Sequence, residues 1–196
     1  QSDRTLFAAS LEDGVLRSTD GGATWNSWNF GLLDLQVLSL VVSPAFEGDQ
    51  TLLIGTGTGL FTSLNAGRAW SEIWLPCGYV PILSLASSPA SVPGLLLAGT
   101  ESSGLYASRD DGQTWQRWGE TTLETVNAVV FDGGTCLALG TDSLFLSRDQ
   151  GQTWNLLPSV AEKIPVAVCA PDGLRLGCQL LVGYSDGELN FIECIK

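Results

Sequence analysis

Carboxylates are the side chains best able to do chemistry in this chain, which has 21 acidic residues and no histidine. A glycosidase uses two carboxyl groups about 5 to 10 Å apart, one of them an acid with a raised pKa. The acids here are scattered through predicted turns, and no pair stands in an unusually apolar setting. The lack of histidine excludes Ser-His-Asp and Cys-His nucleophile systems and most catalytic zinc sites. We therefore predict no catalytic residue.

The formal net charge of −12 excludes several classes of partner. Such a field repels phosphate backbones and anionic lipid, so we expect no nucleic-acid partner. No stretch approaches the roughly 20 apolar residues that span a bilayer, so we expect no membrane insertion. The five cysteines lack the paired C-x-x-C spacing of a zinc site, and we predict neither a metal nor another cofactor.

One eight-residue segment occurs four times, at 18–25, 63–70, 108–115 and 147–154, and it ends each time in tryptophan. These tryptophans are 45, 45 and 39 residues apart. A period near 40 is typical of repeat proteins in which each unit buries the apolar face of its neighbour. The Asp-x-Gly core of the segment suits a tight turn, because the carboxylate accepts backbone hydrogen bonds and glycine takes a positive φ.

Short apolar runs recur at fixed offsets before each segment, and we predict four strands, A to D, in each unit. Strand A is predicted at Val37–Val42, Ile82–Ser87, Val126–Phe131 and Pro165–Cys169. Strand B is predicted at Leu6–Ser10, Leu52–Thr56, Leu96–Thr100, Leu137–Thr141 and Leu180–Tyr184. Strand C is predicted at Val15–Ser18, Leu60–Ser63, Leu105–Ser108, Leu144–Ser147 and Glu188–Ile192, and strand D begins at each tryptophan. Helical periodicity is missing, so the predicted class is all-β.

Four-stranded antiparallel units at this period are blades of a β-propeller. The eight-residue segment resembles the Asp-box, or BNR repeat, with the pattern Ser-x-Asp-x-Gly-x-Thr-Trp. The second copy departs from this pattern, since it has Asn65 for Asp and Ala69 for Thr. We predict that the box positions are structural: Ser18, Asp20, Gly22, Trp25, Ser63, Asn65, Gly67, Trp70, Ser108, Asp110, Gly112, Trp115, Ser147, Asp149, Gly151 and Trp154.

The resemblance implies a single domain, residues 1–196, with units at about 1–36, 37–81, 82–125, 126–164 and 165–196. The first unit lacks strand A, and the last lacks the box and strand D. The sequence therefore predicts either about five blades with incomplete end blades or an excerpt of a larger propeller. The repeat class also favours an extracellular or cell-surface setting.

In Asp-box propellers the box lies at the C-to-D turn, and the functional site usually lies on the opposite face, here called the loop face. That face is built from the B-to-C turns and the D-to-A crossings between blades. The ligand-binding candidates on it are Phe30, Asp34, Tyr79, Glu101, Glu120, Asp142 and Asp186. Three tryptophans recur shortly after the box, and we predict that they pack between blades: Trp28, Trp74 and Trp118.

Proteins with this repeat include sialidases, xyloglucan-cleaving glucanases, sortilin-type receptors and photosystem assembly factors. A sialidase would need three arginines on the inner strands, whereas Arg17, Arg109 and Arg148 stand beside or inside the boxes. We therefore favour a non-catalytic scaffold that binds a protein or glycan through its loop face. A carbohydrate-active glycoside hydrolase, or a fragment of one, is the alternative.

Overall fold

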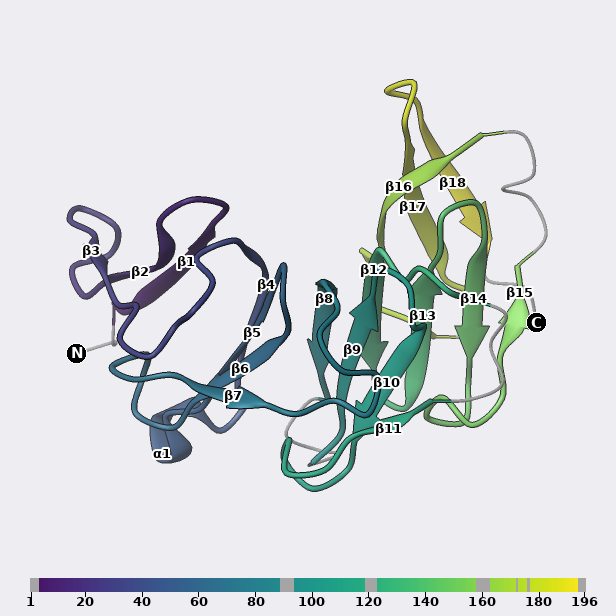
Figure 1. Cartoon of the computed structure of the whole chain (residues 1–196). Coiled ribbons are helices and arrows are strands. Elements are labelled where there is room, and N and C mark those ends of the chain that lie inside the picture. The colour runs from purple at the N-terminus through teal and green to yellow at the C-terminus, as the bar shows by residue number, and fades with distance from the viewer. Residues whose placement is uncertain are drawn as a thin grey trace.

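The computed structural model describes residues 4–88, 94–118, 123–157, 163–171, 173–175 and 177–193. These residues form five antiparallel sheets of three or four strands, which we call blades 1 to 5 (Figure 1). The predicted all-β fold with short antiparallel blades is confirmed. No helix of the described residues is long and apolar enough to cross a membrane.

The blades follow one another along the chain. Blade 1 contains β1 (Leu6–Ser10), β2 (Gly14–Ser18) and β3 (Asn26–Ser27). Blade 2 contains β4 (Val37–Val42), β5 (Leu52–Thr56), β6 (Leu60–Ser63) and β7 (Ser71–Ile73), with the short helix α1 (Phe46–Asp49) between β4 and β5. Blade 3 contains β8 (Ile82–Ser87), β9 (Leu96–Thr100), β10 (Leu105–Ser108) and β11 (Gln116–Arg117). Blade 4 contains β12 (Ala128–Asp132), β13 (Thr135–Leu139), β14 (Leu144–Ser147) and β15 (Asn155–Leu156), and blade 5 contains β16 (Pro165–Cys169), β17 (Gln179–Tyr184) and β18 (Leu189–Glu193).

The predicted strands differ from the observed ones mainly in blade 4. There Gly133 and Gly134 both have positive φ and join Asp132 to Thr135 in a two-residue hairpin turn. Because glycine takes these angles without steric cost, β12 ends one residue later than predicted and β13 begins two residues earlier. Strand β12 also begins two residues later than predicted, at Ala128. The outer strands also begin one residue after each box tryptophan rather than at it.

The core consists of four apolar layers, one between each pair of successive blades. Strand β5 is buried along its whole length, because Leu52 and Ile54 face blade 1 whereas Leu53 faces blade 3. Strands β9 and β13 alternate in the same way between their two neighbours. Burying one leucine side chain stabilises a fold by about 1.5 to 3 kcal/mol, so these layers carry much of the stability.

A glycine in the second strand lets adjacent blades approach closely on the inner side. A side chain on Gly55 would meet the carbonyl oxygen of Ile82 at 2.5 Å, and one on Gly99 would meet that of Val126 at 2.6 Å. A serine beside each glycine donates a hydrogen bond to the same carbonyl: Ser39 Oγ to Ile82 O at 3.1 Å and Ser84 Oγ to Val126 O at 3.2 Å. The same contact thus joins blade 2 to blade 3 and blade 3 to blade 4.

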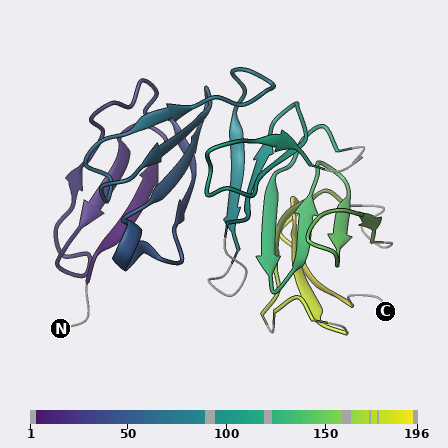
Figure 2. The same ribbon diagram turned by 90° about the horizontal axis from the view of Figure 1, so that it is seen from below.

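The blades form an open arc, with blades 1 and 5 at opposite ends in both views (Figures 1 and 2). Strand β4 packs beside β8, β8 beside β12 and β12 beside β16, so the first strands of blades 2 to 5 line one side of the arc. Successive blades are neighbours throughout, and the described part of the chain forms an arc rather than a closed ring.

Candidate binding pocket between blades 2 and 3

The four boxes form nearly identical turns at one end of the blades. In the first, Ser18 Oγ donates to Asp20 Oδ1 at 2.7 Å and accepts from Gly22 N at 2.9 Å. The same two bonds recur in each of the other copies at 2.7 to 2.9 Å. The residue between the acid and the glycine has a positive φ in every copy: Gly21, Ala66, Asp111 and Gln150. The serine and acid side chains therefore satisfy each other and their own backbone.

Hydrogen bonds keep the box carboxylates ionised. The Thr24 hydroxyl and backbone N–H lower the pKa of Asp20 to about 2. Thr114 and Thr153 lower the pKa of Asp110 and Asp149 to about 2 in the same way. A general acid needs a raised pKa, so these three carboxyl groups are unsuited to protonating a leaving group.

The box tryptophans differ in their surroundings. The indole N–H groups of Trp25, Trp115 and Trp154 donate to the carbonyl of their own box glycine at 3.0 Å, whereas Trp70 donates to Trp28 O at 2.8 Å. Trp70 and Trp115 are buried against the preceding blade. Trp25 is 40% exposed, and no other described blade packs against it on the side where Trp70 and Trp115 meet the preceding blade.

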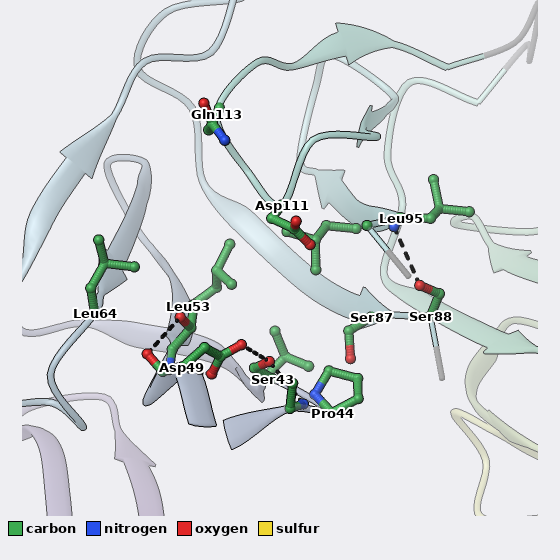
Figure 3. A pocket seen from close by; sticks show the side chains of 15 residues that line it. Ser43, Pro44, Asp49, Leu53, Leu64, Ser87, Ser88, Leu95, Asp111 and Gln113 are labelled. Atoms are coloured by element: carbon green, nitrogen blue, oxygen red, sulfur yellow. Dashed lines mark hydrogen bonds between the residues drawn. The ribbon is translucent and has the colours of Figure 1, made fainter. Parts of the chain in front are cut away.

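A pocket of about 470 Å³ lies between blades 2 and 3, at the end that carries the boxes (Figure 3). Its floor and walls are mainly aliphatic, with Val41 and Leu53 from blade 2 and Leu95 and Leu96 from blade 3. The other lining residues are Ser43, Pro44, Ala45, Asp49, Thr51, Leu64, Ser87, Ser88, Gly94, Asp111 and Gln113. None of these lining residues is aromatic or basic. The site is therefore an apolar hollow of the size that holds a small ligand or a few side chains.

Two carboxylates give the pocket an acidic rim. Asp49 is fixed from α1 by Ser43 Oγ, which donates to its Oδ2 at 2.6 Å, and by Thr51 N, which donates to its Oδ1 at 2.9 Å. Asp111 enters from the opposite blade in the third box, where its backbone has a φ of 57° (Figure 3). With no lysine or arginine among the lining residues, the rim favours a positively charged group.

The residues that shape the pocket are specific to one junction. Helix α1 occurs only in the β4–β5 connection among the described residues, whereas two residues make the corresponding connection in blade 4. Leu64 is 70% exposed and stands at the second box position, where the other copies have Thr19, Arg109 and Arg148. This site was not predicted from the sequence, because the resemblance placed the functional site on the opposite face. The apolar residue at this one box position is the sequence feature that could have indicated it.

The aromatic candidates Phe30 and Tyr79 lie at separate places and do not form one site. Phe30 is exposed, and its carbonyl accepts a hydrogen bond from Trp70 N at 2.9 Å, so this crossing runs beside the second box. Tyr79 is exposed and packs edge-to-face on Trp74, with ring centroids 6.2 Å apart. The prediction that Trp74 packs between blades is therefore wrong. Trp118 is buried under the Arg109 guanidinium, and Trp28 is half-buried under that of Arg17.

The described acidic candidates lie in different turns and crossings and are not gathered into one site. Asp34 accepts from Gln36 N at 2.9 Å and from Thr58 Oγ1 at 3.1 Å. Asp186 forms an ion pair of 3.0 Å with Lys163, which also contacts Glu188. Glu101 and Asp142 are exposed, and Glu120 lies outside the described residues. No group of three or more acids and cysteines able to hold a metal occurs within the described part of the chain.

The arc of blades and the four box turns define this chain as a β-propeller protein built from Asp-box repeats. A family model for the BNR/Asp-box repeat matches residues 145–156, which confirms the resemblance noted in the sequence. No curated protein matches the chain.

Solved structures share the fold at low sequence identity. An ancestral GH74 enzyme superposes with a TM-score of 0.73 at 17% identity, over 97% of this chain and 29% of its own. The extracellular domain of BT4673 from B. thetaiotaomicron gives a TM-score of 0.75 at 17% identity, over 97% of this chain and 26% of its own. YCF48 bound to D1 peptide gives 0.69 at 17% identity, over 95% of this chain and 60% of its own. This chain is thus shorter than each of these propellers, and the likeness concerns the fold.

Proposed function

We propose that this chain is a non-catalytic propeller module that binds a segment of a partner protein in the pocket between blades 2 and 3. The observation that carries the proposal is an aliphatic hollow with two carboxylates and no basic residue in its lining. Such a site fits an aliphatic side chain followed or preceded by lysine or arginine. An acidic protein surface also attracts a cationic segment over long distances.

The lining favours a peptide over a sugar. Sugar-binding sites stack their ligand on aromatic faces, whereas no aromatic residue lines this pocket and its apolar wall is made of leucine, valine, proline and alanine. YCF48, which shares the fold, has been solved with a D1 peptide bound, and it supports peptide binding as a use of this architecture. The extracellular domain of BT4673 likewise supports an extracellular setting as part of the proposal.

Binding is favoured over hydrolysis by the chemistry of the described acids. The box carboxylates have a pKa of about 2 and accept hydrogen bonds from residues of their own turns. The chain has no histidine to act as a general base. A glycoside hydrolase remains the competing hypothesis because GH74 enzymes share the fold.

Selection from a random peptide library displayed on phage tests the proposal. Peptides that combine leucine, isoleucine or valine with lysine or arginine should be enriched on the wild-type chain. Leu64→Arg places a cation at the rim and should weaken the selected peptides about tenfold or more, which corresponds to roughly 1.4 kcal/mol. Leu33→Arg is the matched control, since Leu33 is exposed in the crossing after blade 1 and lies outside the pocket.

A second variant tests the contribution of the acidic rim to peptide binding. Asp111→Asn should weaken lysine-containing peptides and reduce the salt dependence of their binding, because one carboxylate of the rim is lost. If the selected peptides lose binding to the Tyr79→Ala variant but keep binding to the Leu64→Arg variant, their site lies on the loop face and not in this pocket. Turnover of an oligosaccharide that disappears on a single carboxylate-to-amide change would overturn the non-catalytic proposal.

A further inference from the structure

The two carboxylates at the rim of the pocket differ in how many hydrogen bonds they already accept. Asp49 accepts one bond on each oxygen, from Ser43 Oγ at 2.6 Å and from Thr51 N at 2.9 Å. The carboxylate of Asp111 accepts none within the described part of the chain, because the bonds of the third box go to its neighbour Asp110. Both oxygens of Asp111 are therefore free to accept hydrogen bonds from a ligand.

The third box is the one copy with a charged residue at its fourth position. This position holds Gly21 in the first copy, Ala66 in the second and Gln150 in the fourth. All four residues have a positive φ, so the turn itself needs no carboxylate there. The turn therefore does not explain the carboxylate of Asp111, whereas its place in the lining of the pocket gives it a use.

Gly94 leaves space beside the Asp111 carboxylate. A side chain on Gly94, which has a φ of 88°, would approach Asp111 Oδ1 to 3.8 Å and the carbonyl oxygen of Arg109 to 3.2 Å. Leu95 and Leu96, the next two residues, belong to the aliphatic wall of the pocket (Figure 3). A group that binds to Asp111 therefore lies next to apolar side chains.

The basic residue nearest to Asp111 in the sequence does not neutralise it. The Arg109 guanidinium lies over the ring of Trp118, 4.5 Å from the ring centroid, and it forms no ion pair with a described acid. The aromatic face attracts this cation, so Trp118 holds Arg109 away from the rim, and Arg109 does not line the pocket. The charge of Asp111 thus remains available to a cation from outside the chain.

From these observations we propose that the cation of the bound segment is an arginine guanidinium, held by Asp111 beside an aliphatic side chain in the hollow. Arginine recognition rests on the proposed function of the pocket and narrows its ligand from basic residues in general to arginine. A guanidinium donates two parallel hydrogen bonds to one carboxylate, whereas an ammonium acts as a point charge. It is also less strongly hydrated, so it loses less on moving to a rim of leucine side chains. Asp49 attracts either cation through its charge and does not choose between them.

NMR titration of the isotope-labelled 196-residue chain with three dipeptides tests arginine recognition. The dipeptides are N-acetyl-Leu-Arg-amide, N-acetyl-Leu-Lys-amide and N-acetyl-Leu-citrulline-amide, and citrulline has the shape of arginine without its charge. The backbone N–H signals of Leu95, Leu96 and Gln113 report on the pocket. We expect the arginine peptide to bind about three- to fivefold more tightly than the lysine peptide, a range that suits an exposed but well-oriented charge pair. The citrulline peptide should bind most weakly.

Substitution of each rim carboxylate separates recognition of arginine from general attraction of cations. Asp111→Gln introduces the residue type that the fourth box has at this position, and it should lower the affinity for the arginine peptide to that for the lysine peptide. Asp49→Asn keeps an oxygen that can accept from Thr51 N, and it should weaken both charged peptides equally. Glu12→Gln controls for net charge, since Glu12 is exposed in the first hairpin turn and does not line the pocket. It should leave the preference unchanged.

The outcomes separate arginine recognition from peptide binding itself. Equal affinities of the arginine and lysine peptides, with signal shifts at the pocket, would overturn the preference for arginine and leave peptide binding in place. A preference that survives Asp111→Gln in a folded variant, or that is lost in Asp49→Asn, would overturn the role of Asp111. If none of the dipeptides shifts the pocket signals, or if the shifts persist unchanged in Leu64→Arg, the proposed function fails and arginine recognition fails with it.

Discussion

Thr153 Oγ1 donates a hydrogen bond of 2.6 Å to Asp149 Oδ2, and the backbone N–H of Thr153 donates to Oδ1 of the same carboxylate at 2.9 Å. These bonds hold the pKa of Asp149 near 2, below its ordinary value of 3.8. A group whose pKa is lower in the folded state stabilises that state when ionised. This contribution is complete above pH of about 4 and is lost as the pH falls towards 2.

Thr153→Val removes the hydroxyl and should raise the pKa of Asp149. The variant should be less stable than the wild type near neutral pH, and the difference should shrink below pH of about 2, where the carboxyl group is protonated in both proteins. Urea unfolding at the two pH values measures this. Ala69→Val is the control, because the second box has an amide, Asn65, in place of the carboxylate. Its effect should not depend on pH in this range, and equal pH dependence in both variants would contradict the assignment.

Gly99→Ala should destabilise the chain by about 1 to 3 kcal/mol, because a methyl group there overlaps Val126 of the next blade and Ser84. Gly183→Ala has the same position in blade 5 but meets its nearest neighbours at 3.4 Å or more. It should change the free energy of unfolding by less than about 0.5 kcal/mol. Denaturant unfolding at low protein concentration compares the two. Equal losses would mean that close approach of blades is not the reason for the glycine.

Gln150→Gly should stabilise the fourth box. Gln150 has a φ of 59°, and this conformation costs a residue with a side chain about 1 to 2 kcal/mol. Glycine avoids that cost but loses about 0.5 to 1 kcal/mol through its greater freedom in the unfolded chain, so we expect a small net gain. Gln152→Gly, two residues away and without a positive φ, should instead destabilise. Thermal unfolding of both variants tests the sign, and a loss in both would contradict the strain argument.

Trp70→Ala should cost about 3 to 5 kcal/mol, because the indole is 4% exposed in the layer between blades 1 and 2. Trp25→Ala should cost clearly less, since Trp25 is 40% exposed and hydrogen-bonds only within its own turn. Both values come from chemical unfolding of the monomer. Equal costs would show that the indole acts mainly within its turn and not between blades.

Much of the fold could be predicted from local sequence. The box fixes its turn through bonds between residues two to four positions apart, such as Ser147 to Asp149 and Gly151, and these depend on little else. The boxes in turn mark the first four of the five blades and their order. The limits of β12 and β13 were misplaced because two adjacent glycines allow a tighter hairpin than the other blades have.

The candidate site was harder to predict. The pocket joins α1, Leu64 and Asp111, which are distant in sequence and meet only when blades 2 and 3 pack. The exposed Trp74–Tyr79 pair shows the same limitation. Trp74 lies four residues after its box tryptophan, whereas Trp28 and Trp118 lie three residues after theirs, and it packs on exposed Tyr79 rather than between blades.

The sequence alone determined the repeat, the all-β class and the chemistry of the turns, because these rest on contacts within about eight residues. Only the tertiary structure decided which apolar side chains are covered, because their partners lie some forty residues away in an adjacent blade. Leu60 and Leu189 hold the same place in their sheets, yet one is buried and the other is open. The presence of a neighbouring blade makes the difference.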